Sequence, residues 1–164
     1  MAQRYLKILL SAVVGPLAGL WFINNLLNWQ TAVGAVGYAL SQQNHSGYPI
    51  QLVPAVDSVV AASAGLILIC TSEAAAAGLC LFGAWRLWLR RHAEEAVFSA
   101  AKQTAVTGVG FAVLTWFLGF QVIGGAGLMM GQAEGMDGAM RGAFTFGVYS
   151  FLTLIYLGLP DSVA

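Results

Sequence analysis

No lysine or arginine occurs between Lys7 and Arg86, and the acidic residues of that interval are Asp57 and Glu73. A typical soluble chain carries charge on about a quarter of its residues. Here 9% of 164 residues are charged and 59% are hydrophobic. So long an interval without basic residues suits lipid as the surrounding solvent. The chain is therefore predicted to be an integral membrane protein.

Four apolar stretches are long enough to cross a hydrocarbon layer of about 30 Å as helices. The first runs on into Trp21 and Asn24, where a signal peptide would have a small-residue cleavage site, so we expect a retained span. The predicted fold is all-α, with one domain of residues 1–164 forming a membrane four-helix bundle. Its predicted spans cover about residues 6–28, 57–86, 104–128 and 140–159.

The loops between these spans carry their own signals. In the first outer loop, apolar residues between Thr31 and Leu40 recur at helical spacing, which predicts a short helix in the membrane interface. Asp57 or Ser58 can cap the second span, and Pro160 ends the fourth.

Basic residues gather on one side of the predicted bundle. By the positive-inside rule this side is cytoplasmic, which places both termini there. Arg141 alone lies on the other side, and the residues on the basic side are Arg4, Lys7, Arg86, Arg90, Arg91 and Lys102. The chain is expected to cross the membrane several times.

The sequence lacks the residues that several kinds of function require. A net charge of zero without a basic block argues against nucleic-acid binding. His45 and His92 fall in loops on opposite sides of the membrane, so we expect no haem, metal or other cofactor between the spans. Cys70 and Cys80 are too far apart along one helix for a disulfide and are expected to pack as small apolar residues.

Glu73 is predicted to lie near the middle of the bilayer. A charge there is costly, by about 2.5 to 3.5 kcal/mol on insertion scales, so the carboxyl group should be hydrogen-bonded or turned toward protein. One interpretation makes it a proton-relay or substrate-binding group. The other, which we favour, makes it a neutral acid that joins helices through a hydrogen bond.

Other polar residues of the spans are the candidate partners of Glu73. Judged by depth, Tyr149 is the expected partner. Asn24, Asn25 and Gln121 are expected to lie together toward the outer side.

Small residues spaced four apart recur in three of the four spans, a pattern that favours close helix packing in membranes. The predicted packing residues are Gly15 and Gly19, Ala74 and Gly78, and Gly138 and Gly142.

Motifs along nearly the whole chain resemble a bacterial family of predicted small integral membrane proteins with four spans, a domain of unknown function. The most specific is the third-span sequence Trp116 to Phe120 followed by Ile123-Gly124-Gly125. The chain departs from the family pattern at residues 130–138, where tryptophans and a Trp-Asn-Gly-Gln-like sequence are expected. The other matching segments are Asn24-Asn25 with Trp29, Glu73-Ala74 with Cys80 and Gly83-Ala84, Ala101-Lys102, Phe144, Phe146 and Pro160-Asp161. The resemblance implies this architecture and an inner-membrane location.

No nucleophile and base are found at the same depth, so the chain is not expected to be an enzyme. The leading hypothesis is an accessory or structural subunit that docks on a larger electron-transfer complex, respiratory or photosynthetic, through apolar surfaces and an aromatic belt. Its expected partners are the lipid bilayer and other integral membrane subunits, with bound lipid or quinone as a further candidate. The alternative is a small transporter or quinone-handling protein that uses Glu73 in an intramembrane cavity. The residues assigned to the belt are Trp85, Trp88, Trp116, Phe117 and Phe120.

Overall fold

The computed structural model describes residues 1–43 and 50–161. His45 lies outside these ranges. Within them the secondary structure is helical. In chain order, the elements are α1 (Ala2–Leu27), α2 (Trp29–Ser41), α3 (Val59–Leu89), α4 (Glu95–Val113), the π-helix η1 (Leu114–Gly127), the short 3₁₀ helix η2 (Met130–Gln132) and α5 (Asp137–Gly158).

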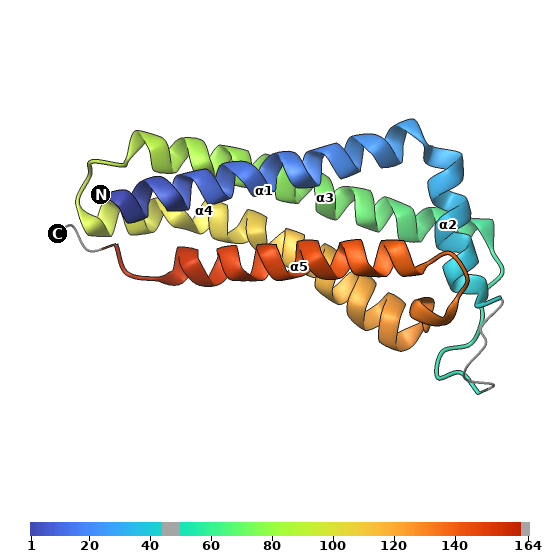
Figure 1. The fold of residues 1–164 in the computed structure, drawn as a ribbon. Coiled ribbons are helices and arrows are strands. Elements are labelled where there is room, and N and C mark those ends of the chain that lie inside the picture. Colours follow the sequence, from blue (N-terminus) through green and yellow to red (C-terminus); the bar gives the residue numbers. More distant parts are fainter. Residues whose placement is uncertain (44–49, 162–164) are drawn as a thin grey trace.

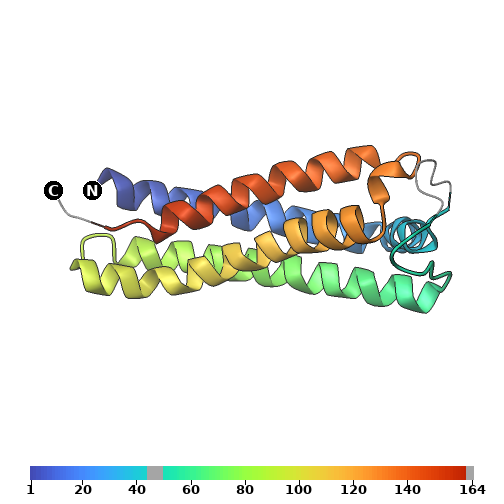
Figure 2. The ribbon, with the colours of Figure 1, turned by 90° about the horizontal axis from the view of Figure 1, so that it is seen from below.

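The long helices run side by side as an elongated bundle (Figure 1). In the described part of the chain, four helices are long and apolar enough to span a membrane: α1, α3, α4 continued by η1, and α5. This confirms the predicted all-α membrane bundle. The start of α1 and the segment just after α5 lie at the same end of it, which we call the terminal end, as Figure 2 also shows.

The short helix predicted in the first outer loop exists as α2, which turns steeply away from α1 at the end of the bundle opposite the terminal end (Figure 1). The two helices meet at Asn28, whose amide group donates to the Asn24 carbonyl. The inner face of α2 packs on the first turns of α3, where Val33 lies in a cluster with Ala62 and Leu66. Because α2 covers these turns, it closes this end of the bundle.

The starts of two spans differ in how well the sequence predicted them. Ser58 caps α3 as predicted, since its hydroxyl accepts a hydrogen bond from the Ala61 N–H at 3.3 Å. The third span is part of a longer helix that begins at Glu95, ahead of the predicted start at about residue 104. Its first two turns are less apolar than the rest and pack on the terminal end of the bundle through Phe98, which is fully buried.

Two of the predicted packing glycines lie against α3. A Cβ atom at Gly15 would come within 2.7 Å of the Leu81 side chain, and one at Gly19 would lie 3.5 Å from the Ala77 Cβ. Around Gly78 and Gly138 there is open space, and Gly142 has a neighbour only on its own helix. The small-xxx-small pattern therefore identified the contact on α1, and its glycines on α3 and α5 do not make contacts between helices.

A close approach of the α3 and α4 backbones depends on two glycines that the pattern did not single out. A Cβ at Gly83 would lie 2.5 Å from the Ala105 backbone nitrogen, and one at Gly108 would lie 2.6 Å from the Cys80 nitrogen. Each glycine faces backbone, which cannot move aside cheaply. The free thiol of Cys80 is buried at this contact, as expected of a packing cysteine.

The last part of the third span is π-helical, which the sequence did not predict. In η1 the hydrogen bonds run from residue i+5 to residue i, and π-helical stretches are usually single turns at functional or strained places. At its start, the Thr115 hydroxyl donates to the Phe111 carbonyl at 2.9 Å, and the Thr115 and Ser72 hydroxyls share a hydrogen bond at 2.6 Å. These bonds tie the α4–η1 junction to the middle of α3.

We predict that Gly108→Ala destabilises the protein by about 1 to 3 kcal/mol, as overpacking does. Gly110→Ala is the control on the same helix, because nothing lies within 4 Å of the Cβ it would add. It should leave stability unchanged or raise it slightly, since alanine favours helix. The measurement is thermal unfolding of purified protein in detergent; equal melting temperatures for the two variants would contradict the packing argument.

Candidate functional site

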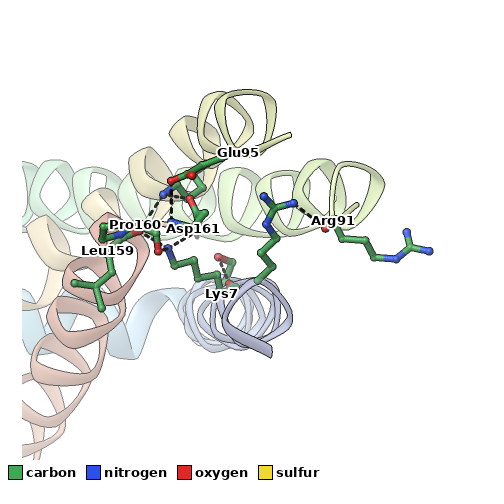
Figure 3. Close-up of polar contacts among 9 residues, drawn as sticks. Lys7, Arg91, Glu95, Leu159, Pro160 and Asp161 are labelled. Atoms are coloured by element: carbon green, nitrogen blue, oxygen red, sulfur yellow. Dashed lines mark hydrogen bonds and ion pairs between the residues drawn. The ribbon is translucent and has the colours of Figure 1, made fainter. Parts of the chain in front are cut away.

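The terminal end of the bundle holds a cluster of buried charges around Asp161, which lies just beyond α5. Its carboxylate pairs with the ammonium groups of Lys7 from α1 and Lys102 from α4 (Figure 3). Asp161 and Lys7 are at most 1% exposed and Lys102 is 7% exposed. The segment after α5 is thereby joined to two other helices.

Backbone groups complete this cluster. Lys7 also donates to the Leu159 carbonyl, and Lys102 donates to the same oxygen at 3.3 Å. The Asp161 N–H in turn donates to the Glu95 carboxylate at 3.4 Å. Leu159 is the C-cap of α5, so the two lysines satisfy a carbonyl that the helix leaves free.

Arg4 makes a second buried connection beside the first. Its guanidinium Nη1 donates to the carbonyls of Arg91 at 3.0 Å and Ala93 at 2.6 Å, in the loop between α3 and α4. The same group stacks over the Phe98 ring, 4.6 Å from its centroid. The start of α1 is therefore fixed to that loop by charge and by packing.

The balance of charges determines the protonation of Asp161. Burial alone would raise the pKa of this carboxyl, but its bonds to Lys102 and Lys7 outweigh burial and hold the pKa below the ordinary value of 3.8. Asp161 is thus ionised at neutral pH. Arg4, Lys7 and Lys102 were expected as indicators of topology; in the structure they are also part of the interior.

Glu73 occupies the second polar site, close to the midpoint of α3. Its carboxylate is 2% exposed and accepts a hydrogen bond from the Asn25 amide at 2.9 Å. The small residues around it on α3, Cys70 and Ala76, are buried as well. The acid therefore faces protein and links α1 to α3.

The predicted partners of Glu73 are arranged differently from expectation. Tyr149 was the wrong choice, because its side chain is 60% exposed on the outer face of α5. Asn25 takes that place, since the end of α1 packs directly on α3. The other two residues of the predicted group take no part in this bond: Gln121 donates to the Met140 carbonyl at 3.0 Å, and Asn24 is exposed.

The predicted aromatic belt divides in two. Trp85, Trp88 and Phe117 are exposed and available to lipid or a partner. Trp116 is 3% exposed and packs in the core against Phe146, with ring centroids 5.6 Å apart. The assignment of Trp116 to the belt was wrong, because a helix orientation that exposes Phe117 turns the adjacent Trp116 inward.

Sequence reasoning did not recognise the Asp161 cluster as a site. The signal available was the pair of matching segments Ala101-Lys102 and Pro160-Asp161, each with a charge at the border of an apolar span. Charges so placed are usually solvated. Their pairing depends on the distance between α4 and the end of α5, which no local pattern reports.

The fold and these sites define a four-span helical membrane protein with buried ionic contacts at one end. A model of the family described as "Predicted small integral membrane protein (DUF2165)" matches residues 3–160, and the chain belongs to that family. Comparison with curated proteins and with solved structures gave no match.

We predict that Asp161→Asn lowers stability by about 3 to 5 kcal/mol, because it leaves buried lysines without a counter-ion. Asp137→Asn is the matched control: it removes the acid of the exposed Arg141–Asp137 pair, whose loss should cost about 0 to 1 kcal/mol. Thermal unfolding in detergent measures both. Similar losses in the two variants would show that the Asp161 pair contributes no more than a surface pair.

The same cluster predicts a pH dependence. Since the folded-state pKa of Asp161 is lowered, its pairing stabilises the protein fully above the ordinary carboxyl pKa of 3.8 and loses this effect as the pH falls through the folded value. Melting temperatures of the native protein should therefore drop in strong acid. The drop should be smaller in Asp161→Asn, and an equal drop would assign it to other groups.

We predict that Glu73→Gln keeps the bond to Asn25 and changes stability little, whereas Glu73→Leu loses about 0.5 to 1.5 kcal/mol. Asn25→Leu should resemble Glu73→Leu, because it removes the other partner. Unfolding and assembly of the three variants are compared in detergent. A Glu73→Gln variant that assembles normally but loses its cellular function would instead indicate proton chemistry.

Proposed function

We propose that the protein is a non-catalytic accessory subunit that docks on a larger membrane complex, an electron-transfer assembly of the respiratory or photosynthetic kind. In this proposal it resides in a bacterial inner membrane with both termini in the cytoplasm. The arrangement of basic residues supports that orientation, because Arg86, Arg90 and Arg91 gather at the terminal end.

The observation that carries the docking proposal is the position of Tyr149. Its ring stands on the outer face of α5 near the middle of that helix, 60% exposed. Among the described residues its hydroxyl has no hydrogen-bond partner. A hydroxyl group at this depth is unfavourable in hydrocarbon and is satisfied by a neighbouring protein.

Other exposed hydroxyls of the spans differ from Tyr149. Thr71 and Thr107 donate to carbonyls one turn back on their own helices, so neither needs a partner. A tyrosine hydroxyl is too far from its own backbone to do this. Apolar residues flank Tyr149 on the exposed face of α5 and can pack against another helix: Phe144, Val148, Leu152 and Ile155.

The surroundings of Glu73 support a role without catalysis. The acid is enclosed and paired with Asn25, and it lines neither the hollow between the last turns of α3 and the first turns of α4 nor the one beside Phe111 and Leu154. A transporter or quinone site would need space beside this carboxyl. We therefore infer a helix-joining role for Glu73 and leave the transport hypothesis as the alternative.

The test is to solubilise native membranes in mild detergent and follow a tagged chain by native electrophoresis and mass spectrometry. We expect it to migrate with larger redox-active subunits, and Tyr149→Phe to weaken this association about tenfold without changing the stability of the isolated chain. Tyr5→Phe, also exposed but at the terminal end, is the control. Recovery of the native protein solely as a free chain contradicts the proposal.

A further inference from the structure

A hollow of about 610 Å³ opens on the outside of the bundle at the terminal end, between the last turns of α3 and the first turns of α4. It exists because α4 presents alanines there while α3 presents large side chains. Its lining residues are Phe82, Trp85, Arg86, Leu89 and Arg90 of α3, and Ala96, Val97, Ala100 and Ala101 of α4.

The hollow is cationic at one end and apolar at the other. Phe82, Arg86 and Arg90 follow one another at four-residue spacing along α3, so they lie on one face in the order apolar, basic, basic. Arg90 is the last of them, at the helix C-cap. The hollow therefore extends from the apolar part of the span, at Phe82, to its polar border, at Arg90.

Among the described residues, no acid forms an ion pair with either arginine of the hollow. The ion pairs among the described residues involve Lys7, Lys102 and Arg141. Arg86 donates one bond, to the Thr104 hydroxyl at 2.7 Å, and keeps its other donors. Of the two acids at the start of α4, Glu95 accepts a hydrogen bond from the Asp161 N–H (Figure 3), and Glu94 is in none of these ion pairs.

Arg91, by contrast, binds a residue of its own helix end. Its guanidinium donates to the Trp88 carbonyl at 2.8 Å and stacks on the Trp88 ring, 4.3 Å from the centroid. The Arg91 guanidinium is therefore held at the end of α3 by these contacts. Arg86 and Arg90 remain exposed beside an apolar trough.

We propose that this hollow binds one anionic phospholipid of the bilayer, with its phosphate at Arg86 and Arg90 and an acyl chain along the alanines of α4. Guanidinium groups bind phosphate oxygens through paired hydrogen bonds. Basic pockets between transmembrane helices on the cytoplasmic side are suited to anionic headgroups. Phe82, Leu89 and Val97 supply the apolar contact that a free phosphate ion would not use.

The experiment is native mass spectrometry of the full chain released from detergent, titrated with phosphatidylglycerol or with phosphatidylcholine. We expect one phosphatidylglycerol to bind about tenfold or more tightly than phosphatidylcholine. The Arg86→Gln/Arg90→Gln variant should lose this preference. The control Arg91→Gln/Arg141→Gln removes the same total charge and should keep it.

A second variant tests the apolar part of the hollow separately from its two arginines. Ala100→Phe fills it from an exposed position, so the fold should survive, as thermal unfolding will verify. Loss of phosphatidylglycerol binding with both arginines present supports the site. Equal lipid binding by both arginine variants, unchanged binding in Ala100→Phe, or complete displacement of the lipid by excess inorganic phosphate would overturn it.

Discussion

The fold depends on how closely α3 can approach its neighbours. In lipid, helices gain little by hiding apolar surface from one another, so association relies on close packing and hydrogen bonds. Gly83 and Gly108 let the α3 and α4 backbones meet where a Cβ would collide, and Gly15 on α1 leaves room for the Leu81 side chain of α3. Once α1 and α4 lie against α3, the bond between Asn25 and Glu73 and the bonds from Thr115 to Ser72 and Phe111 all fall within reach.

The terminal end is held by buried charges in addition to packing around Phe98. Lys7, Lys102 and Asp161 come from three separate parts of the chain, and the one carboxylate pairs with both ammonium groups in the interior. A buried pair of this kind adds less to stability than its loss removes, because each partner is left uncompensated without the other. Its effect is to specify where the segment after α5 lies. The same end carries the exposed Arg86 and Arg90 of the proposed lipid site. Its buried charges are therefore paired within the protein, and these two exposed charges are available to a ligand.

Much of the architecture could be predicted, because local signals report it directly. Apolar length gave the spans, helical spacing between Thr31 and Leu40 gave α2, and Ser58 gave a cap. The site was predicted less well. Glu73 was recognised as a buried acid, but its partner was chosen by depth, and depth does not say which face of a helix a residue occupies. Tyr149 has suitable depth and faces outward.

By itself, the sequence determined that this chain crosses a membrane as four helices, because a span needs about 20 apolar residues and the positions of scarce charges are written in the chain. The tertiary structure alone decided which small residues touch, which acid meets which amide, and that Asp161 gathers two lysines. The physical reason is that these contacts depend on the rotation and offset of whole helices. Such rigid-body relations arise from packing over many residues at once, and no short segment encodes them.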